Sequence, residues 1–245
     1  MSLLSALTTD NTIEDEKDVV GGGSRVRESA LYPMKIVLAY LNKSAGGALS
    51  LNLTFKDDEG EVRQQLWMTS GTAKGGKNYY ERDGKRNYLP GFLHANALCL
   101  LTVGKEISQL DTEDKVVNLY SYEAKAEVPT KVDMVMDLLD QEVLVGLIKQ
   151  TVDKNVKNDA GVYVPSGETR EENEVDKIFR ASDRMTTAEI RAEATEASFV
   201  NLWDQKWTGK VKDKSTKGAT GVAGAPQQAA AAAPAANRPK TSLFG

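Results

Sequence analysis

The chain has 245 residues, of which 40% are hydrophobic, and it carries 31 basic against 35 acidic side chains, a net charge of −4. This apolar share is ordinary for a globular protein and excludes disorder throughout, and the near balance of charge argues against a highly basic nucleic-acid coat. The longest apolar runs, 36–41 and 143–148, are far shorter than the ~20 residues that span a bilayer, and no basic patch precedes an apolar stretch at the N-terminus, so we expect neither a membrane span nor a signal peptide.

The single cysteine, Cys99, and the single histidine, His94, leave little for metal or nucleophile chemistry. One thiol cannot form an internal disulfide, which fits a reducing compartment, and a Cys/His zinc site lacks ligands. The acidic residues form no DxD or HExxH pattern that would place carboxylates for metal or general acid–base work. We therefore expect no metal, no cofactor and no enzymatic activity, with both residues packed in or near the core.

The N-terminal end of the chain is acidic. Residues 10–18 hold five acidic residues against Lys17, and three glycines follow at 21–23. A charge run broken by glycines is typical of a solvated segment. Residues 1–23 are therefore predicted to be a flexible acidic arm.

The C-terminal end is basic and low in complexity. Residues 206–245 hold seven basic residues against Asp213 alone, and from Ser215 onward they are mainly Gly, Ala, Pro, Gln and Thr. Such a composition buries too little apolar surface to offset the entropy lost on ordering. We predict a folded domain over 24–207 and a disordered tail, basic and rich in Ala, Gly and Pro, over 208–245.

Strands are predicted at the start of the domain. Residues 48–56 alternate apolar and polar side chains, the pattern of a strand with one packed and one wet face. The apolar stretch 32–41 precedes it, and 61–69 follows it after a glycine-bearing turn. We expect a three-stranded meander in which Arg63 and Trp67 project together from the wet face. The alternative is that a later helix covers Trp67.

The stretch 70–89 combines aromatic with basic residues and has no apolar periodicity. Its Asp83-Gly84 pair suits a tight hairpin turn. Aromatic rings offer stacking platforms to unpaired bases and basic side chains attract phosphates, so the mixture is typical of sequence-tolerant single-strand binding. The alternative is a solvated hairpin whose tyrosines pack on the domain. The residues concerned are Lys74, Lys77, Tyr79, Tyr80, Arg82, Lys85, Arg86 and Tyr88.

Helices and strands alternate in the second half of the domain. The apolar spacing after Pro90 predicts a helix that ends near Gly104. The remaining elements are predicted as a strand at 116–122, a helix at 131–139, a strand at 142–152, a strand in the second half of 168–180, and weak helices at 187–195 and 197–207.

A second basic cluster stands at the end of the strand predicted at 142–152. It contains Lys149, Lys154 and Lys157, and Tyr163 follows in a loop predicted over 155–167. These residues have the same aromatic and cationic character as the first cluster. The alternative is an ordinary solvated, charged turn.

The order of the predicted strands is compatible with a five-stranded OB-type barrel, with 116–122 as an accessory strand. The predicted fold class is therefore mainly β with helical insertions. OB barrels bind single strands across their second and third strands and through the neighbouring loops. The candidate nucleic-acid-binding residues on these elements are Lys56, Arg63, Trp67, Lys74, Lys77, Tyr79, Tyr80, Arg82, Lys85, Arg86, Tyr88, Lys149, Lys154, Lys157 and Tyr163.

Several segments also match a known pattern: ALTTD (6–10), LAYLNKSAGGALSLNLTF (38–55), YLPGF (88–92), KVVNLY (115–120), LIKQTVDKNVKND (147–159) and ETREENEVDKIF (168–179). Together they resemble the single-stranded DNA-binding proteins of podoviruses of the schitovirus type, over most of 5–207. The resemblance implies an OB fold and cooperative coating of phage DNA intermediates in replication, recombination and sometimes transcription. It also implies a cytoplasmic location, in the host cell if the protein is viral.

We predict non-enzymatic, largely sequence-independent binding of single-stranded DNA during phage replication and recombination. The alternative is a transcription or replication adaptor that acts mainly through protein contacts of the tail. Replication, recombination or transcription proteins are the partners then expected, and Leu243 and Phe244 would be the anchor. Many bacterial single-strand binders end in an acidic tail, whereas this tail is basic, which puts the usual bacterial partners in doubt.

Overall fold

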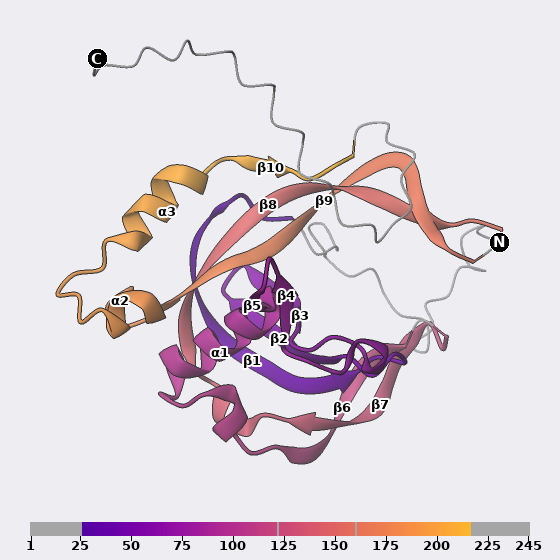
Figure 1. Ribbon diagram of the computed structural model, residues 1–245, viewed down its shortest axis with the longest axis horizontal. Coiled ribbons are helices and arrows are strands. Elements are labelled where there is room, and N and C mark those ends of the chain that lie inside the picture. The colour runs from indigo at the N-terminus through magenta and orange to yellow at the C-terminus, as the bar shows by residue number, and fades with distance from the viewer. Residues whose placement is uncertain (1–25, 122, 160, 217–245) are drawn as a thin grey trace, which may run out of the picture.

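The computed structural model describes residues 26–121, 123–159 and 161–216, and the fold is mainly β with short helices at its surface (Figure 1). The predicted acidic arm and most of the predicted tail, including Leu243 and Phe244, lie outside the described residues. In the part that is described, no helix is long and apolar enough to cross a membrane.

The predicted meander is confirmed. Strands β1 (Ala30–Lys43), β2 (Leu49–Asp57) and β3 (Gly60–Trp67) pair antiparallel in sequence order. The period of two explains the pairing, because alternate residues of β2, such as Leu51 and Phe55, are fully buried while the residues between them face outward. A bulge in β1 between Ile36 and Leu38 shifts its register against β2.

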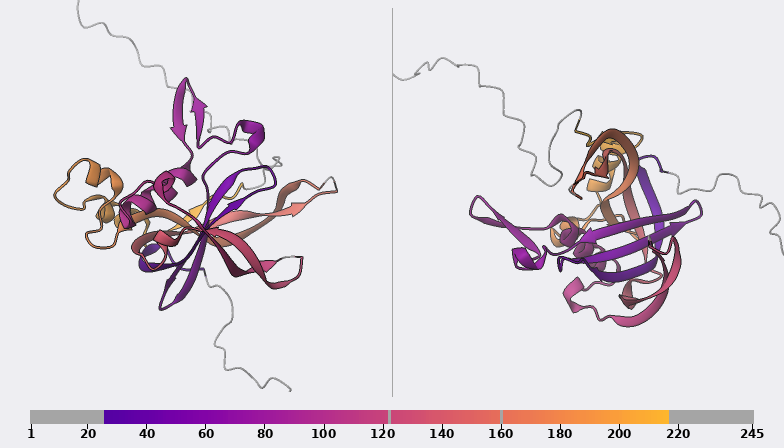
Figure 2. Two further views of the ribbon diagram at one scale, coloured as in Figure 1. Left: turned by 90° about the horizontal axis from the view of Figure 1, so that it is seen from below. Right: turned by 90° about the vertical axis from the view of Figure 1, so that its right-hand side faces the viewer.

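The tyrosine-rich segment forms a short 3-10 helix, η2 (Thr72–Lys74), and a hairpin of β4 (Tyr79–Arg82) and β5 (Lys85–Tyr88). The hairpin turn falls at the predicted pair, where Asp83 and Gly84 both have positive φ, at 52° and 70°. Such angles are typical of a two-residue hairpin turn. The hairpin projects away from the large sheet (Figure 2).

Helix α1 (Pro90–Thr102) begins with proline in its first turn and ends before Gly104, as predicted. Its N-terminus packs against the end of β3. A Cβ on Gly91 would lie only 2.2 Å from the backbone oxygen of Trp67, so this close approach requires glycine. A 3-10 turn, η3 (Ile107–Gln109), follows.

The helix predicted at 131–139 is wrong. Strand β6 (Glu113–Ser121), close to the predicted one, pairs with β7 (Ala126–Met134), and only the short η4 (Met136–Leu138) follows. The physical reason is tertiary: β7 pairs with β6 along its whole length and, at Met134, with Tyr40 of β1. Strand pairing outweighs a local spacing that fits a helix equally well.

Strands β8 (Glu142–Lys157) and β9 (Tyr163–Arg180) form one long hairpin. The loop predicted at 155–167 is therefore wrong for most of its length. A strand was predicted only for the second half of 168–180, but β9 covers the whole of this range. The outer part of the hairpin extends beyond the core, so both faces of these strand ends carry polar residues. They therefore lack the apolar–polar alternation by which a strand is recognised in a sequence.

Helices α2 (Thr187–Arg191) and α3 (Phe199–Trp207) lie within the two weak helices that were predicted. Strand β10 (Val211–Asp213) then pairs parallel with β8. The backbone N–H of Gly209 also donates to the carbonyl of Ser29 at 2.9 Å. Structure therefore continues past the predicted boundary at residue 207.

The main strands follow the order β3-β2-β1-β8-β9, with β7 on β1 and β10 on β8. The two ends of this order approach each other, because the backbone N–H of Val175 in β9 donates to Oε1 of Gln64 in β3 at 3.0 Å. No ladder joins β3 to β9 in the described residues, so the sheet is not closed.

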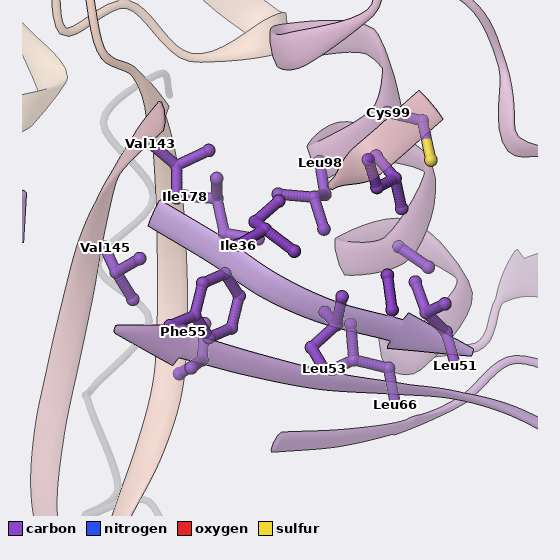
Figure 3. Close-up of a cluster of buried hydrophobic side chains, with 14 of the residues drawn as sticks. Ile36, Leu51, Leu53, Phe55, Leu66, Leu98, Cys99, Val143, Val145 and Ile178 are labelled. Atoms are coloured by element: carbon purple, nitrogen blue, oxygen red, sulfur yellow. The ribbon is translucent and has the colours of Figure 1, made fainter. Parts of the chain in front are cut away.

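Two apolar clusters stabilise this arrangement. The larger one gathers side chains from the meander, α1, β8 and β9, and Figure 3 shows Ile36, Phe55 and Leu98 meeting within it. The smaller one lies between α3 and the opposite face of β8 and β9, around Phe179 and Trp203. The inward faces of the sheet are thus filled, and neither cluster lies on the outer face of β1–β3.

Candidate nucleic-acid interface

The outer face of the meander forms the floor of a groove of about 800 Å³. Its floor comes from outward-facing residues of β1, β2 and β3, and its wall comes from the β6–β7 hairpin. The groove is lined by Tyr40, Asn52, Arg63, Gln65, Val117 and Leu119, among others.

A hydrogen-bonded set of polar side chains forms the centre of the floor. The side-chain amides of Asn52 and Gln65 both donate to Oγ of Ser50, each at 3.2 Å, and Oγ of Ser50 donates to the carbonyl of Asn42 at 3.3 Å. The amide oxygens and remaining amide protons suit the donor and acceptor edges of nucleobases. The floor therefore presents both donors and acceptors at the surface of β2 and β3.

Arg63 and Trp67 project from the outer face of β3, as predicted, with Gln65 between them. The Trp67 side chain is 42% exposed, so no helix covers it. The Arg63 guanidinium pairs only loosely with Glu61, at 3.6 Å. Arg63 also affects Tyr40: burial raises the pKa of the Tyr40 hydroxyl, and the nearby guanidinium partly offsets this rise.

The groove wall was not predicted as part of the site. Val117 and Leu119 of β6 line the groove together with Tyr40 of β1. No local pattern places 116–122 near the outer face of β1–β3, because its pairing depends on β7, which was expected to be a helix. Tyr40 was also missed, since it stands in a stretch that is apolar almost throughout.

The β4–β5 hairpin follows η2 in the chain and carries six of the fifteen predicted residues: Tyr79, Tyr80, Arg82, Lys85, Arg86 and Tyr88. One face holds Tyr79 and Tyr88, and the other holds Tyr80 with Arg82 and Lys85, because opposite residues of an antiparallel pair share a face. The base of the hairpin is fixed to the β1–β2 turn. There the backbone N–H of Thr72, in η2, donates to the carbonyl of Gly46 at 2.8 Å.

The tyrosine rings on the two faces of the hairpin differ in how many side chains lie against them. Tyr79 lies between two cations, with Lys77 Nζ 5.4 Å and the Arg86 guanidinium 5.0 Å from its ring centre. Tyr88 packs one side against Phe92, with 5.0 Å between ring centres, and remains 54% exposed. Tyr80 is 44% exposed and shares its face with two cations.

The outer part of the β8–β9 hairpin brings together Lys154, Lys157 and Tyr163. Lys154 pairs with Glu168 at 2.9 Å, and Lys157 Nζ lies 5.3 Å from the ring centre of Tyr163. A hollow of about 630 Å³ lies alongside, lined by Lys154, Tyr163 and Arg170 among others. The β6–β7 and β8–β9 hairpins extend to the same side of the molecule, whereas β4–β5 projects elsewhere (Figures 1 and 2).

Several predicted site residues stand apart from the groove. Lys149 has a side chain only 16% exposed, held at 3.1 Å by both Glu28 and Glu171. Lys56 lies at the far end of β2, next to Lys35, in a separate hollow. Lys74 is exposed on η2, beside the hairpin.

Neither Cys99 nor His94 lies near the groove lining. Burial raises the pKa of the Cys99 thiol to about 12, and burial lowers the pKa of His94. Both residues lie on α1, where Cys99 belongs to the core cluster. Within the described ranges, no group of three or more His, Cys, Asp and Glu residues is placed to hold a metal ion.

No protein-family model, curated protein or solved structure matches this chain. The resemblance to the schitovirus-type single-strand binders therefore stays a prediction, and the function has to be argued from the residues themselves.

Proposed function

We propose that this chain is a non-enzymatic, largely sequence-independent binder of single-stranded DNA. The observation that carries the proposal is the groove on the outer face of β1–β3. It has an amide floor at Asn52 and Gln65 and a cation at Arg63, and the exposed ring of Trp67 stands beside it on β3. These are the groups that unpaired bases and a phosphate backbone require.

The proposed fold is an OB-type barrel formed by β1, β2, β3, β8 and β9. The strand order and the position of α1 between β3 and β8 support this assignment, and so does the bond from Val175 to Gln64 at the open seam. In OB folds the second and third strands form the binding face. Here the groove lies on β2 and β3 and on the neighbouring part of β1.

Ligand chemistry favours a single strand over a duplex. The exposed rings beside the groove and on the hairpin stack on bases only when the bases are unpaired. Many cations of the site also have a carboxylate partner, such as Arg86 with Glu81 at 3.2 Å and Arg82 with Asp83 at 3.6 Å. Phosphate contacts alone would then give weak binding, so stacking has to supply much of the affinity.

The biological role that we propose follows the resemblance stated above. A protein that coats single strands without sequence preference would protect DNA intermediates in phage replication and recombination. Partner proteins and a role in transcription would depend on the tail, most of which lies outside the described residues.

Titration with oligo(dT) tests the proposal, with tryptophan fluorescence as the readout. Trp67 is exposed next to the groove, so bound bases should quench it. The matched control is a DNA duplex at equal nucleotide concentration. Quenching by oligo(dT) at concentrations at which the duplex has no effect would support the proposal, and equal or stronger binding of the duplex would contradict it.

A further inference from the structure

The basic run at 206–214 lies on the surface of the domain beside α3. Strand β10 holds this run in place through its pairing with β8. The backbone N–H of Lys214 also donates to the carbonyl of Thr151 at 2.9 Å, and Oγ of Ser29 donates to the carbonyl of Lys210. The lysines of this run are therefore attached to a fixed part of the structure.

Lysines of this run and of β9 lie over two aromatic rings. The ring centre of Trp207 is 5.0 Å from Nζ of Lys206 and 5.6 Å from Nζ of Lys212. The ring centre of Phe199 is 5.1 Å from Nζ of Lys177, and its side chain is 38% exposed. The α3 surface, defined as Lys177, Phe199, Lys206, Trp207 and Lys210, thus repeats the mixture of cations and rings found on the β4–β5 hairpin.

Part of the positive charge here is free for a ligand. Lys212 and Lys214 pair with Glu174, at 3.6 and 2.7 Å. Within the described residues, Lys177, Lys206 and Lys210 form no ion pair. By this measure the α3 surface offers more available cations than the β8–β9 hairpin, where Lys154 is paired.

The α3 surface is separate from the groove. Helix α3 covers β8 and β9 from outside, through Trp203 and Val200, whereas the groove lies over β1–β3. Figure 1 shows α3 and the β6–β7 hairpin on opposite sides of the sheet.

We propose that the α3 surface is a second contact site for single-stranded DNA. The inference rests on the proposed function and extends it: a strand longer than the groove continues onto this surface. A base that contacts the ring of Phe199 or Trp207 displaces a lysine that lies over that ring, and Lys177, Lys206 and Lys210 contact phosphates. Affinity should then increase with strand length beyond what one groove can hold.

Fluorescence separates the two sites. The chain has three tryptophans, and Trp203 is only 3% exposed, with its Nε1–H donating to Asp176 at 2.8 Å. In Trp67→Phe the reporter at the α3 surface is the half-buried Trp207, and in Trp207→Phe the exposed reporter is Trp67. An oligo(dT) of about 40 nucleotides exceeds the roughly 4–16 that one OB fold covers, so it should quench both variants. Quenching of Trp207→Phe alone would overturn the second site and leave the proposed function standing.

A charge variant gives an independent test. Replacing Lys206 and Lys210 by Ala should reduce the log–log salt slope for the long strand by about 1.4, which is about 25-fold in affinity over a ten-fold range of salt. The control replaces Lys35 and Lys105, two exposed lysines that pair with Asp140 and Asp137 elsewhere on the surface. Equal slopes for the two double variants would overturn the second site. If the unchanged protein binds no oligo(dT), the proposed function fails, and this inference fails with it.

Discussion

The guanidinium of Arg86 lies 5.0 Å from the centre of the Tyr79 ring, and Tyr79 stands opposite Tyr88 in the register of the hairpin. Lys77 stands near the same ring at 5.4 Å. A base that stacks on Tyr79 has to displace one of these cations. Tyr80 lies on the other face of the hairpin, and within the described residues no cation lies over its ring.

Replacement of the hairpin tyrosines by Ala should therefore weaken binding unequally. Tyr80→Ala and Tyr88→Ala should each cost about 1 to 3 kcal/mol of binding free energy, as for a base stacked on an aromatic ring. Tyr79→Ala should cost less, because its ring is already occupied. Equilibrium titration with oligo(dT) measures all three. Three variants that bind like the parent while they remain folded would exclude the hairpin as a stacking platform.

Salt dependence reports on the cations of the groove. Contact with about three to five phosphates predicts a log–log salt slope of roughly −2 to −3.5 for a single strand. Arg63→Ala should reduce the magnitude of this slope by about 0.7, because one phosphate contact is lost. Arg63→Lys is the matched control and should keep the slope. A slope near zero for the unchanged protein would contradict binding through the phosphate backbone.

The parts of the fold that were predicted correctly depend on local sequence. Alternation at 48–56 is enough to define β2, and Asp83-Gly84 is enough to define the β4–β5 turn. Pro90 and Gly104 likewise mark the two ends of α1. In each case the determining residues lie within one element or next to it.

The parts that were missed depend on contacts between distant segments. Val132 and Leu139 fit a helix by spacing, yet Val132 pairs with Lys115 of β6. β10 has only three residues, and its pairing with β8 cannot be read from a lysine-rich run. For the same reason the groove wall and Tyr40 were absent from the predicted site, whereas Arg63 and Trp67 follow from the alternation of β3.

Gly146 allows the Trp203 ring to approach β8. A Cβ at this position would lie 2.8 Å from Cζ2 of Trp203, and the ring cannot easily move because Asp176 holds its Nε1–H. Gly146→Ala should destabilise the protein by about 1 to 3 kcal/mol through overpacking. Gly46→Ala is the control, since its nearest neighbour, Oγ of Ser44, would be 3.9 Å away, and it should change stability little. Urea denaturation measures both, and equal midpoints would show that the contact with Trp203 is not tight.

The Glu189 carboxylate joins α2 to α3, and this link should depend on pH. It accepts the backbone N–H of Thr186 at 2.9 Å and those of Ser198 and Phe199, each at 2.8 Å. Burial by itself would raise the pKa of Glu189, but hydrogen bonds from Phe199, Thr186 and Ser198 outweigh it and lower the pKa to about 2. One carboxylate thus satisfies backbone donors at the start of both helices.

A carboxylate whose pKa is lower in the folded protein stabilises the fold above its unfolded pKa of about 4.3 and loses this contribution as the pH falls toward the folded value. Glu189→Gln should therefore be less stable than the parent at pH 7, by about 1 to 2 kcal/mol, as for the loss of a good helix cap. The difference should shrink as the pH falls from about 4.3 toward 2, because a protonated glutamate resembles glutamine. Urea denaturation of both proteins at several pH values measures it. Other carboxylates titrate in both proteins and cancel in the comparison, so a difference that stays constant down to pH 2 would show that the charge of Glu189 does not hold α2 and α3 together.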